Sequence, residues 1–137
     1  MTKPTPIVDP GSKPFWDGVA EKRLMLKACR ACGKPHFYPR ELCPHCGSDD
    51  LDWIEASGEG EIYSYTICHR PAGPAFADDA PYVIAIVALD EGPRMMTQIN
   101  GSREALAIGR RVKVDYQKVN DDFMLPFFVI AEQGAAQ

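Results

Sequence analysis

Two short cysteine motifs are the residues in this sequence whose types and spacing could bind a metal ion. Cys29 and Cys32 enclose two residues and precede a glycine, and Cys43 and Cys46 repeat this pattern after ten intervening residues. A Cys-x-x-Cys turn aims both sulfurs at one ion, and the glycine permits a backbone conformation that a side chain resists. Four thiolates close a tetrahedral shell, so the spacing predicts a structural Zn²⁺ site rather than a catalytic one.

Three other interpretations of these cysteines stay open at the level of sequence. The four thiols could be buried without a metal, or they could bind iron and carry an electron. His36 and His45 lie near the motifs and could replace a ligand, although the cysteine set is already complete. A segment of roughly forty residues cannot bury much surface, so we expect the metal to hold it together.

Length and composition limit the kind of protein. The 137 residues, with a mass of 15.2 kDa, allow one domain or a compact domain with a small appendage. No apolar run approaches the length that spans a bilayer, and the first residues lack the apolar stretch of a signal peptide. Five cysteines, four of them in close pairs, favour metal binding in a reducing compartment over a disulfide framework. We therefore expect a cytoplasmic protein without a membrane span.

The charge is divided unevenly along the chain. The net charge is −4, but residues 1–46 carry eight Lys and Arg against four Asp and Glu, whereas residues 47–137 carry seven against fifteen. A nucleic-acid binder of this size usually has a basic surface, so the acidic second part argues against that class. The basic first part could meet a phosphorylated small molecule or an acidic protein surface.

The elements that would hold the cysteines follow from residue patterns. Ser12 and Pro14 suit the start of a short helix, and residues 24–27 predict a strand that leads into the first cysteine pair. Beyond the second pair, β-branched and aromatic runs predict five strands, with a loop at 71–80 and helical turns at 102–108. The five predicted strands are 61–70, 82–89, 94–99, 111–119 and 123–131. This string fits a small five-stranded barrel of the oligonucleotide/oligosaccharide-binding (OB) type, although a short sandwich would give a similar pattern.

The expected organisation is therefore mainly β, with the metal-binding segment ahead of the barrel. We expect a flexible arm, a helix with its lead-in strand, a zinc ribbon, an OB-fold barrel and a frayed tail. Their predicted limits are residues 1–12, 13–28, 29–57, 58–132 and 133–137, respectively.

No group of residues in the sequence supplies a nucleophile with a base and an orienting partner, so no catalytic residue is predicted. Phe15 and Trp16 on the leading helix could pack on the barrel or anchor a partner, because such aromatic residues are frequent at interface hot spots. Phe76 lies in a loop rich in Pro and Gly and is a candidate contact for a ligand or a partner.

The order of several motifs resembles one protein family. The sequence contains Pro14-Phe15-Trp16, both cysteine motifs, Phe37-Tyr38-Pro39-Arg40, Gly58-x-Gly60, Tyr63-Ser64-Tyr65-Thr66, His69-Arg70-Pro71, Leu89-Asp90-Glu91-Gly92 and Ile108-Gly109. Over about residues 13–131, this set resembles the zinc-ribbon OB-fold proteins of the former domain of unknown function 35, which are associated with acyl-CoA. The paired cysteine motifs alone occur in many ribbons, whereas the ordered set is far more specific.

The resemblance implies a helical N-terminal segment, a rubredoxin-like zinc ribbon and a C-terminal OB-fold barrel. It implies Cys29, Cys32, Cys43 and Cys46 as ligands of one structural Zn²⁺ ion, and it transfers no catalytic residue. Members of the family typically act as non-catalytic subunits beside thiolases, lipid-transfer-type thiolases and aldolases, or hydratases, where they help to bind or channel the acyl-CoA.

The resulting hypothesis is a non-catalytic accessory subunit of a thiolase-superfamily enzyme in acyl-CoA metabolism. In it, Arg70 and Phe76 contact the acyl-CoA, and Phe15, Trp16 and Arg40 contact the partner subunit. The alternatives are a stand-alone module for single-stranded nucleic acid, a rubredoxin-like electron carrier, and a scaffold that never touches CoA. The sequence does not distinguish among acyl groups or partner enzymes, and it does not specify the stoichiometry.

Overall fold

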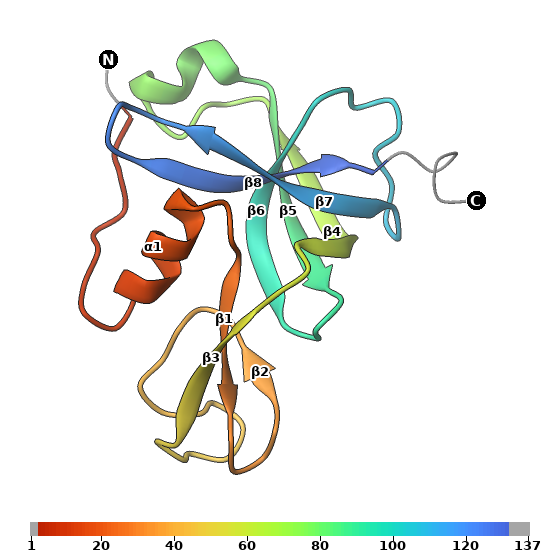
Figure 1. Cartoon of the computed structure of the whole chain (residues 1–137). Helices are drawn as coiled ribbons and strands as arrows, with labels where there is room; N and C mark the ends of the chain where they lie inside the picture. Colours follow the sequence, from red (N-terminus) through yellow and green to blue (C-terminus); the bar gives the residue numbers. More distant parts are fainter. Residues whose placement is uncertain (1–2, 132–137) are drawn as a thin grey trace.

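A small sheet and a closed barrel follow each other along the chain. The structure is a computed structural model, and it describes residues 3–131. One helix, α1 (Lys13–Ala20), precedes a three-stranded sheet, and the remaining strands form the barrel. In Figure 1 the small sheet extends away from the barrel, and α1 lies beside the junction between them.

Helix α1 is built by a local turn and one apolar face. The Oδ1 atom of Asp9 accepts the N–H of Ser12 at 2.8 Å, which orders the chain just before the helix. Pro14 suits the first turn because the N–H that it lacks would have no helical partner there. Phe15 and Val19 are four residues apart, so both lie on the buried face. The helix contacts β1 and β8 and thereby joins the two sheets.

The small sheet has the strand order β2-β1-β3 and is antiparallel throughout. Its central strand is β1 (Met25–Cys29), and its edges are β2 (Pro35–His36) and β3 (Leu51–Glu55). Cys29 ends β1 opposite Leu51, so the first cysteine is held by the sheet itself. We refer to this sheet and its two cysteine turns, residues 25–55, as the ribbon.

The barrel contains five strands in the order β4-β5-β6-β8-β7. They are β4 (Glu59–Cys68), β5 (Tyr82–Leu89), β6 (Arg94–Asn100), β7 (Arg111–Lys118) and β8 (Met124–Ile130), and the 3₁₀ helix η1 (Pro74–Asp79) joins β4 to β5. Strand β4 pairs with both β5 and β7, and a short parallel pairing of β6 with β8 completes the circle. The closed barrel decides between the two predicted all-β arrangements and excludes the sandwich.

Two glycines allow β4 to turn sharply into the barrel. Gly58 has a φ of +82°, a left-handed conformation that side chains rarely adopt, and a Cβ atom there would lie 2.6 Å from Val114. Gly60 pairs with both neighbouring strands, and a Cβ atom at this position would collide with the carbonyl oxygen of Ala88. These positions explain the Gly-x-Gly pattern between the ribbon and the barrel.

One hydrophobic core serves both parts of the molecule. Alternate residues of β5 point inward, and Phe128 of β8 is completely buried among them. Phe15 of α1, Leu24 and Leu26 belong to the same buried cluster. The start of the ribbon is therefore anchored in the barrel core, whereas its cysteine turns lie outside that cluster.

The sequence patterns predicted most of these elements. The leading helix, the strand before Cys29, the barrel strands and the hairpin of β5 and β6 are confirmed. The prediction of helical turns at 102–108 is wrong, because this segment forms only turns between Gly101 and Gly109, which both have positive φ angles. Most residues of this segment are exposed, so little tertiary packing would support a helix there. The predicted loop at 71–80 contains η1.

The structure describes most of the predicted N-terminal arm and none of the predicted C-terminal tail. Residues 3–9 form no helix or strand, and Lys3 makes an ion pair with Asp79 of η1. The predicted tail, residues 133–137, lies outside the described residues. The domain limits stay predictions. Within residues 3–131, no helix is both long and apolar enough to cross a membrane.

Candidate metal centre and barrel pocket

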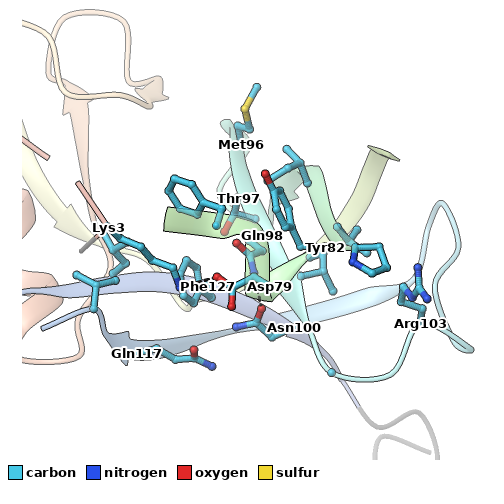
Figure 2. A pocket seen from close by; sticks show the side chains of 18 of the residues that line it. Lys3, Asp79, Tyr82, Met96, Thr97, Gln98, Asn100, Arg103, Gln117 and Phe127 are labelled. Carbon is cyan, nitrogen blue, oxygen red and sulfur yellow. Dashed lines mark hydrogen bonds and ion pairs between the residues drawn. The ribbon is translucent and has the colours of Figure 1, made fainter. Parts of the chain in front are cut away.

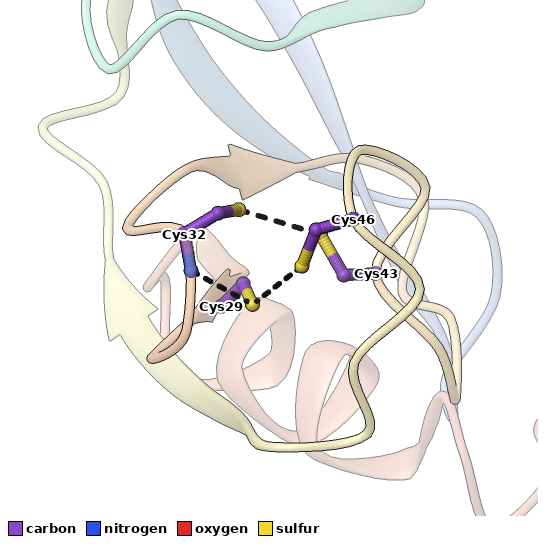
Figure 3. A group of neighbouring side chains, drawn as sticks. All are labelled: Cys29, Cys32, Cys43 and Cys46. Carbon is purple, nitrogen blue, oxygen red and sulfur yellow. Dashed lines mark hydrogen bonds between the residues drawn. The ribbon is translucent and has the colours of Figure 1, made fainter.

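The ribbon brings its four cysteines together at one point. Cys29 ends β1 and Cys32 lies in the turn that follows, while Cys43 and Cys46 come from a second turn (Figure 3). All four Sγ atoms lie within 4.8 Å of one another, and none of these cysteines is in a disulfide. The spacing of the motifs predicted this cluster, and the structure forms it.

The arrangement of sulfurs fits a tetrahedral zinc ion. Four sulfurs at about 2.3 Å from Zn²⁺ would be separated by about 3.8 Å. The Sγ atoms of Cys29 and Cys46 are 3.5 Å apart, and those of Cys32 and Cys43 are 3.7 Å apart. The backbone N–H of Cys32 donates to Sγ of Cys29 at 3.4 Å, as turns around metal-bound thiolates do.

Charge also favours a cation at this point. Burial raises the pKa of Cys43, but the backbone N–H groups of Cys46 and His45 outweigh it and lower this pKa to about 6. The N–H of Ser48 lowers the pKa of Cys46, whereas the neighbouring thiols, beginning with Cys29, raise it to about 12. Clustered thiols therefore cannot all ionise by themselves, and a divalent cation supplies the missing positive charge. Bound Zn²⁺ would link the two turns and leave no position for a substrate.

Neither nearby histidine joins the cluster of sulfurs. Among the described residues, the one group with metal-binding geometry contains the four cysteines and no histidine. His36 in β2 is 4% exposed, and its Nε2 atom accepts the backbone N–H of Arg40 at 3.2 Å. His45 is exposed in the second cysteine turn. The interpretation of His36 or His45 as a ligand is therefore not supported by their positions.

A pocket of about 720 Å³ opens at one end of the barrel (Figure 2). It is enclosed by η1 and by parts of β5, β6, β7 and β8, with residues of the N-terminal arm at its edge. Apolar side chains, including Val83, Ile99 and Phe127, line part of its wall. The cationic side chains of Lys3, Arg103 and Lys118 also line it. Its size and mixed lining are typical of small-molecule sites.

The structure separates the two residues that were predicted to contact a ligand. Phe76 lies in η1 and lines this pocket, with its ring 6.5 Å from that of Tyr82. Lys3 approaches the same ring, with Nζ 5.8 Å from the ring centre. Arg70 is exposed and is not among the residues that line the pocket.

Sequence reasoning missed the polar wall of the pocket. Gln98 and Asn100 lie on the same face of β6, and the Nε2 atom of Gln98 donates to Oδ1 of Asn100 at 3.0 Å. Alternation with the buried residues of β6 was the available signal, because it places polar side chains on the opposite face. Nothing in the sequence indicated that Lys3 would reach this site.

A smaller aromatic groove of about 200 Å³ lies between α1, the ribbon and the barrel. The Nε1–H of Trp16 donates to the hydroxyl of Tyr38 at 3.0 Å, and Tyr38 is 41% exposed. Met96, which is 67% exposed, also lines the groove. Phe15 also lines the groove but is only 1% exposed, because its side chain packs in the core, so its contact with a partner stays a prediction. Arg40 is an exposed residue of the ribbon and is not among the residues that line this groove.

Comparison with known proteins matches both parts of this fold. Residues 16–52 match the rubredoxin-like zinc ribbon domain of ChsH2, and residues 53–117 match the C-terminal OB-fold domain of ChsH2. A DUF35 domain-containing scaffold protein of Methanocaldococcus jannaschii is 34% identical over 110 residues, which are 78% of this chain and 77% of that protein. This chain belongs to the DUF35 family. The predicted zinc ribbon and OB-fold barrel are confirmed.

Two further similar proteins are a subunit named after an enzyme and a chain in a solved aldolase structure. A probable enoyl-CoA hydratase alpha subunit of Thermomonospora curvata is 36% identical over 127 residues, which cover 92% of this chain. The chain spans only 39% of the length of that relative. A chain in the solved structure described as the Ltp2-ChsH2(DUF35) aldolase superposes with a TM-score of 0.82 at 36% identity, over 93% of this chain and 100% of that one.

Proposed function

We propose that this DUF35 chain is a non-catalytic, zinc-binding accessory subunit of a thiolase-superfamily enzyme in acyl-CoA metabolism. The likeness to the full DUF35 chain of the Ltp2-ChsH2 aldolase carries this proposal. The hydratase subunit from Thermomonospora curvata adds a second class of partner, and the scaffold name of the archaeal relative agrees with a non-catalytic role. The reducing environment that free thiols need makes the cytoplasm the expected location.

The barrel pocket is the part of this subunit that would contact the acyl-CoA. Its apolar wall suits an acyl chain or the pantetheine arm, and the ammonium and guanidinium groups at its edge suit phosphates. Phe76 supplies an aromatic surface in η1, the same helix whose Asp79 pairs with Lys3. Arg70 lies outside this pocket and would reach the CoA only in a channel completed by the partner.

The aromatic groove is the surface that would contact the partner subunit. Tyr38 and Met96 are exposed side chains that line the groove together with Trp16, and large aromatic and methionine side chains are enriched at protein interfaces. Arg40, an exposed residue two positions after Tyr38, would add a positive charge to this surface. The four cysteines would bind Zn²⁺ and hold the ribbon part of the surface in place.

The first experiment identifies the partner. The tagged protein is purified from its native cells, and the proteins that accompany it are identified by mass spectrometry. We expect a thiolase-like, aldolase or hydratase subunit in near-stoichiometric amounts. Trp16→Ala should reduce its recovery at least tenfold, because interface tryptophans are frequent hot spots. Tyr65→Ala, a change of an exposed aromatic residue outside the groove, is the control. A set of nucleic-acid proteins instead would support the stand-alone module and contradict the proposal.

The second experiment tests contact with CoA by calorimetry, with and without the identified partner. Phe76→Ala should weaken acyl-CoA binding by about tenfold, since a lost aromatic contact costs on the order of 1–2 kcal/mol. Ile108→Ala, an exposed apolar residue outside the pocket, should leave binding unchanged. Equal affinity of all three proteins would exclude Phe76 from the CoA site, and binding only in the presence of the partner would assign that site to the partner. Metal analysis of the same samples should find one Zn²⁺ per chain, whereas iron would support the electron carrier.

A further inference from the structure

The N-terminal arm brings one cation to the barrel pocket. Residues 3–9 form no helix or strand before the turn that precedes α1. Ile7 is 91% exposed and Val8 is 42% exposed, so this part of the arm does not belong to the hydrophobic core. Lys3 and Pro4 nevertheless line the barrel pocket, at the edge shown in Figure 2. The arm therefore contributes a charged side chain to a pocket whose other walls are built by the barrel.

The ammonium group of Lys3 meets two side chains of η1. It forms an ion pair with the carboxylate of Asp79, and it lies 5.8 Å from the ring centre of Phe76. The side chains of Lys3 and Asp79 are 36% and 40% exposed, so water reaches this ion pair and screens it. A screened ion pair is weak, and another anion can replace its carboxylate.

The charged residues of the pocket lining favour such an anion. Asp79 is the single acidic residue among those that line the pocket, whereas Lys3, Arg103 and Lys118 are cationic, so the lining carries a net charge of +2. Within residues 3–131, neither Arg103 nor Lys118 forms an ion pair. The cations attract an anionic ligand, and the carboxylate of Asp79 opposes it.

We propose that Lys3 binds a phosphate group of a ligand in the barrel pocket and that Asp79 competes with this phosphate for the Lys3 ammonium. The proposal rests on the proposed function, in which this pocket takes the phosphates of an acyl-CoA. Before a phosphate enters, the carboxylate of Asp79 occupies the ammonium group. A phosphate that enters displaces the carboxylate, and no covalent bond changes.

Charge explains why a phosphate can win this competition. A phosphate monoester carries a charge of about −1.5 to −2 near pH 7 and three acceptor oxygens, whereas a carboxylate carries −1 and two oxygens. Arg103 and Lys118 attract the phosphate as well. A thioester without phosphates gains nothing from Lys3, so the exchange would select ligands that carry the nucleotide part of CoA over ligands that carry only the acyl arm.

The test measures the binding of two probes to the full zinc-loaded chain by calorimetry, with any tag at the C-terminus. The probe 3′-phosphoadenosine 5′-diphosphate carries phosphates without the acyl arm, and pantetheine carries the arm without phosphates. Asp79→Asn should bind the nucleotide about threefold more tightly, because the competing carboxylate is gone, and Lys3→Gln should bind it about threefold more weakly. Neither variant should change the affinity for pantetheine. Each measurement is repeated with the partner subunit that co-purifies.

Matched variants remove the same charges outside the pocket. Asp78→Asn changes the other acidic residue of η1, and Lys13→Gln changes an exposed lysine of α1 that pairs with Asp17. Both should leave the affinity for the nucleotide unchanged. The double variant Lys3→Gln/Asp79→Asn should bind the nucleotide no more tightly than Lys3→Gln does, because it has no ammonium group for which a carboxylate could compete.

Four outcomes would overturn the inference. Weaker binding in both Asp79→Asn and Lys3→Gln would show that the ion pair supports the pocket wall and does not compete with the ligand. Equal gains in Asp79→Asn and Asp78→Asn would show a general effect of charge on η1. Unchanged affinity in Lys3→Gln, or no nucleotide binding with or without the partner, would exclude Lys3 from a phosphate site. Recovery of the partner tests the proposed function independently, so this inference can fail alone.

Discussion

The ribbon and the barrel achieve stability by different means within one chain. In the ribbon beyond β1, the buried residues are His36 and Cys43, and β2 is two residues long. The barrel strands are longer, with seven to ten residues each. Alternate residues of β5 are buried, and Phe128 is completely buried. Hydrophobic burial can therefore hold the barrel, whereas the ribbon depends on the ion that its four thiols would bind.

Residues of the ribbon and residues of the barrel are therefore under different constraints. Residues of the ribbon are constrained by metal binding, and the rest of its surface is free to contact a partner. Residues of the barrel strands are constrained by packing on the inner face, so the barrel pocket forms at one end and draws on η1 and the arm. The comparison predicts that the two parts respond differently to the same perturbation.

The largest effect should follow from loss of the metal. Cys43→Ser removes one thiolate, and zinc binding contributes on the order of 10–16 kcal/mol in zinc-finger peptides. We expect amides of residues 30–50 to lose their protection from hydrogen exchange, while β5 and β6 keep theirs. Hydrogen exchange measured by NMR or mass spectrometry reads both parts in one sample. Cys68→Ser, outside the cluster, is the control, and simultaneous loss of protection in the barrel would contradict the comparison.

A moderate effect should follow from a cavity in the barrel. Phe128 is 0% exposed and lies on β8, which pairs with both β6 and β7. Phe128→Ala should lower the free energy of unfolding by about 3–5 kcal/mol, measured by urea denaturation of the zinc-loaded protein. Met96→Ala removes an exposed side chain and should cost less than about 0.5 kcal/mol. Similar costs for the two variants would mean that the barrel core does not limit stability.

The smallest effect concerns an ion pair on the barrel surface. Arg111 donates two hydrogen bonds to Asp90, at 2.9 and 2.8 Å, and these bonds lower the pKa of the Asp90 carboxyl from 3.8. A lowered pKa stabilises the folded state above pH 3.8, and this gain disappears as the pH falls through the lowered value. Because both side chains are about half exposed, Arg111→Gln should cost only about 0.2–1 kcal/mol at pH 7.

The pKa of the Asp90 carboxyl reports on this ion pair more directly than the free energy of unfolding does. A ¹³C carboxyl titration should show a higher pKa for Asp90 in Arg111→Gln than in the wild type. Arg70→Gln, which removes an exposed guanidinium elsewhere, should leave that pKa unchanged. This titration also compares the stability of the two parts of the molecule. At acid pH, protonated thiols release the metal from the ribbon. A lowered pKa of Asp90 under the same conditions would show that the barrel is still folded. The same titration curve in all three proteins would show that the ion pair does not form in solution.

Local patterns predicted the parts of the molecule that depend on near neighbours. The cysteine turns, the helix start at Pro14 and the hairpin of β5 and β6 each involve residues close in sequence, and the structure contains all of them. The helical turns expected at 102–108 were wrong, because the glycines on either side set the path of the chain there. The burial of Phe15 was equally undecided in the sequence, because only the barrel provides the surface that covers it.

The sequence by itself determined the metal-binding set, the alternation of the strands and the family to which the chain belongs. These properties depend on spacing over a few residues or on the order of motifs, which a linear pattern contains. Only the tertiary structure decided which polar side chains share a cavity. Gln98 and Lys3 line the same barrel pocket, and His36 of the ribbon and Glu91 of the turn after β5 line another cavity, because folding brings these distant segments together. Long-range pairing and packing determine such meetings, and no local pattern of residue types encodes them.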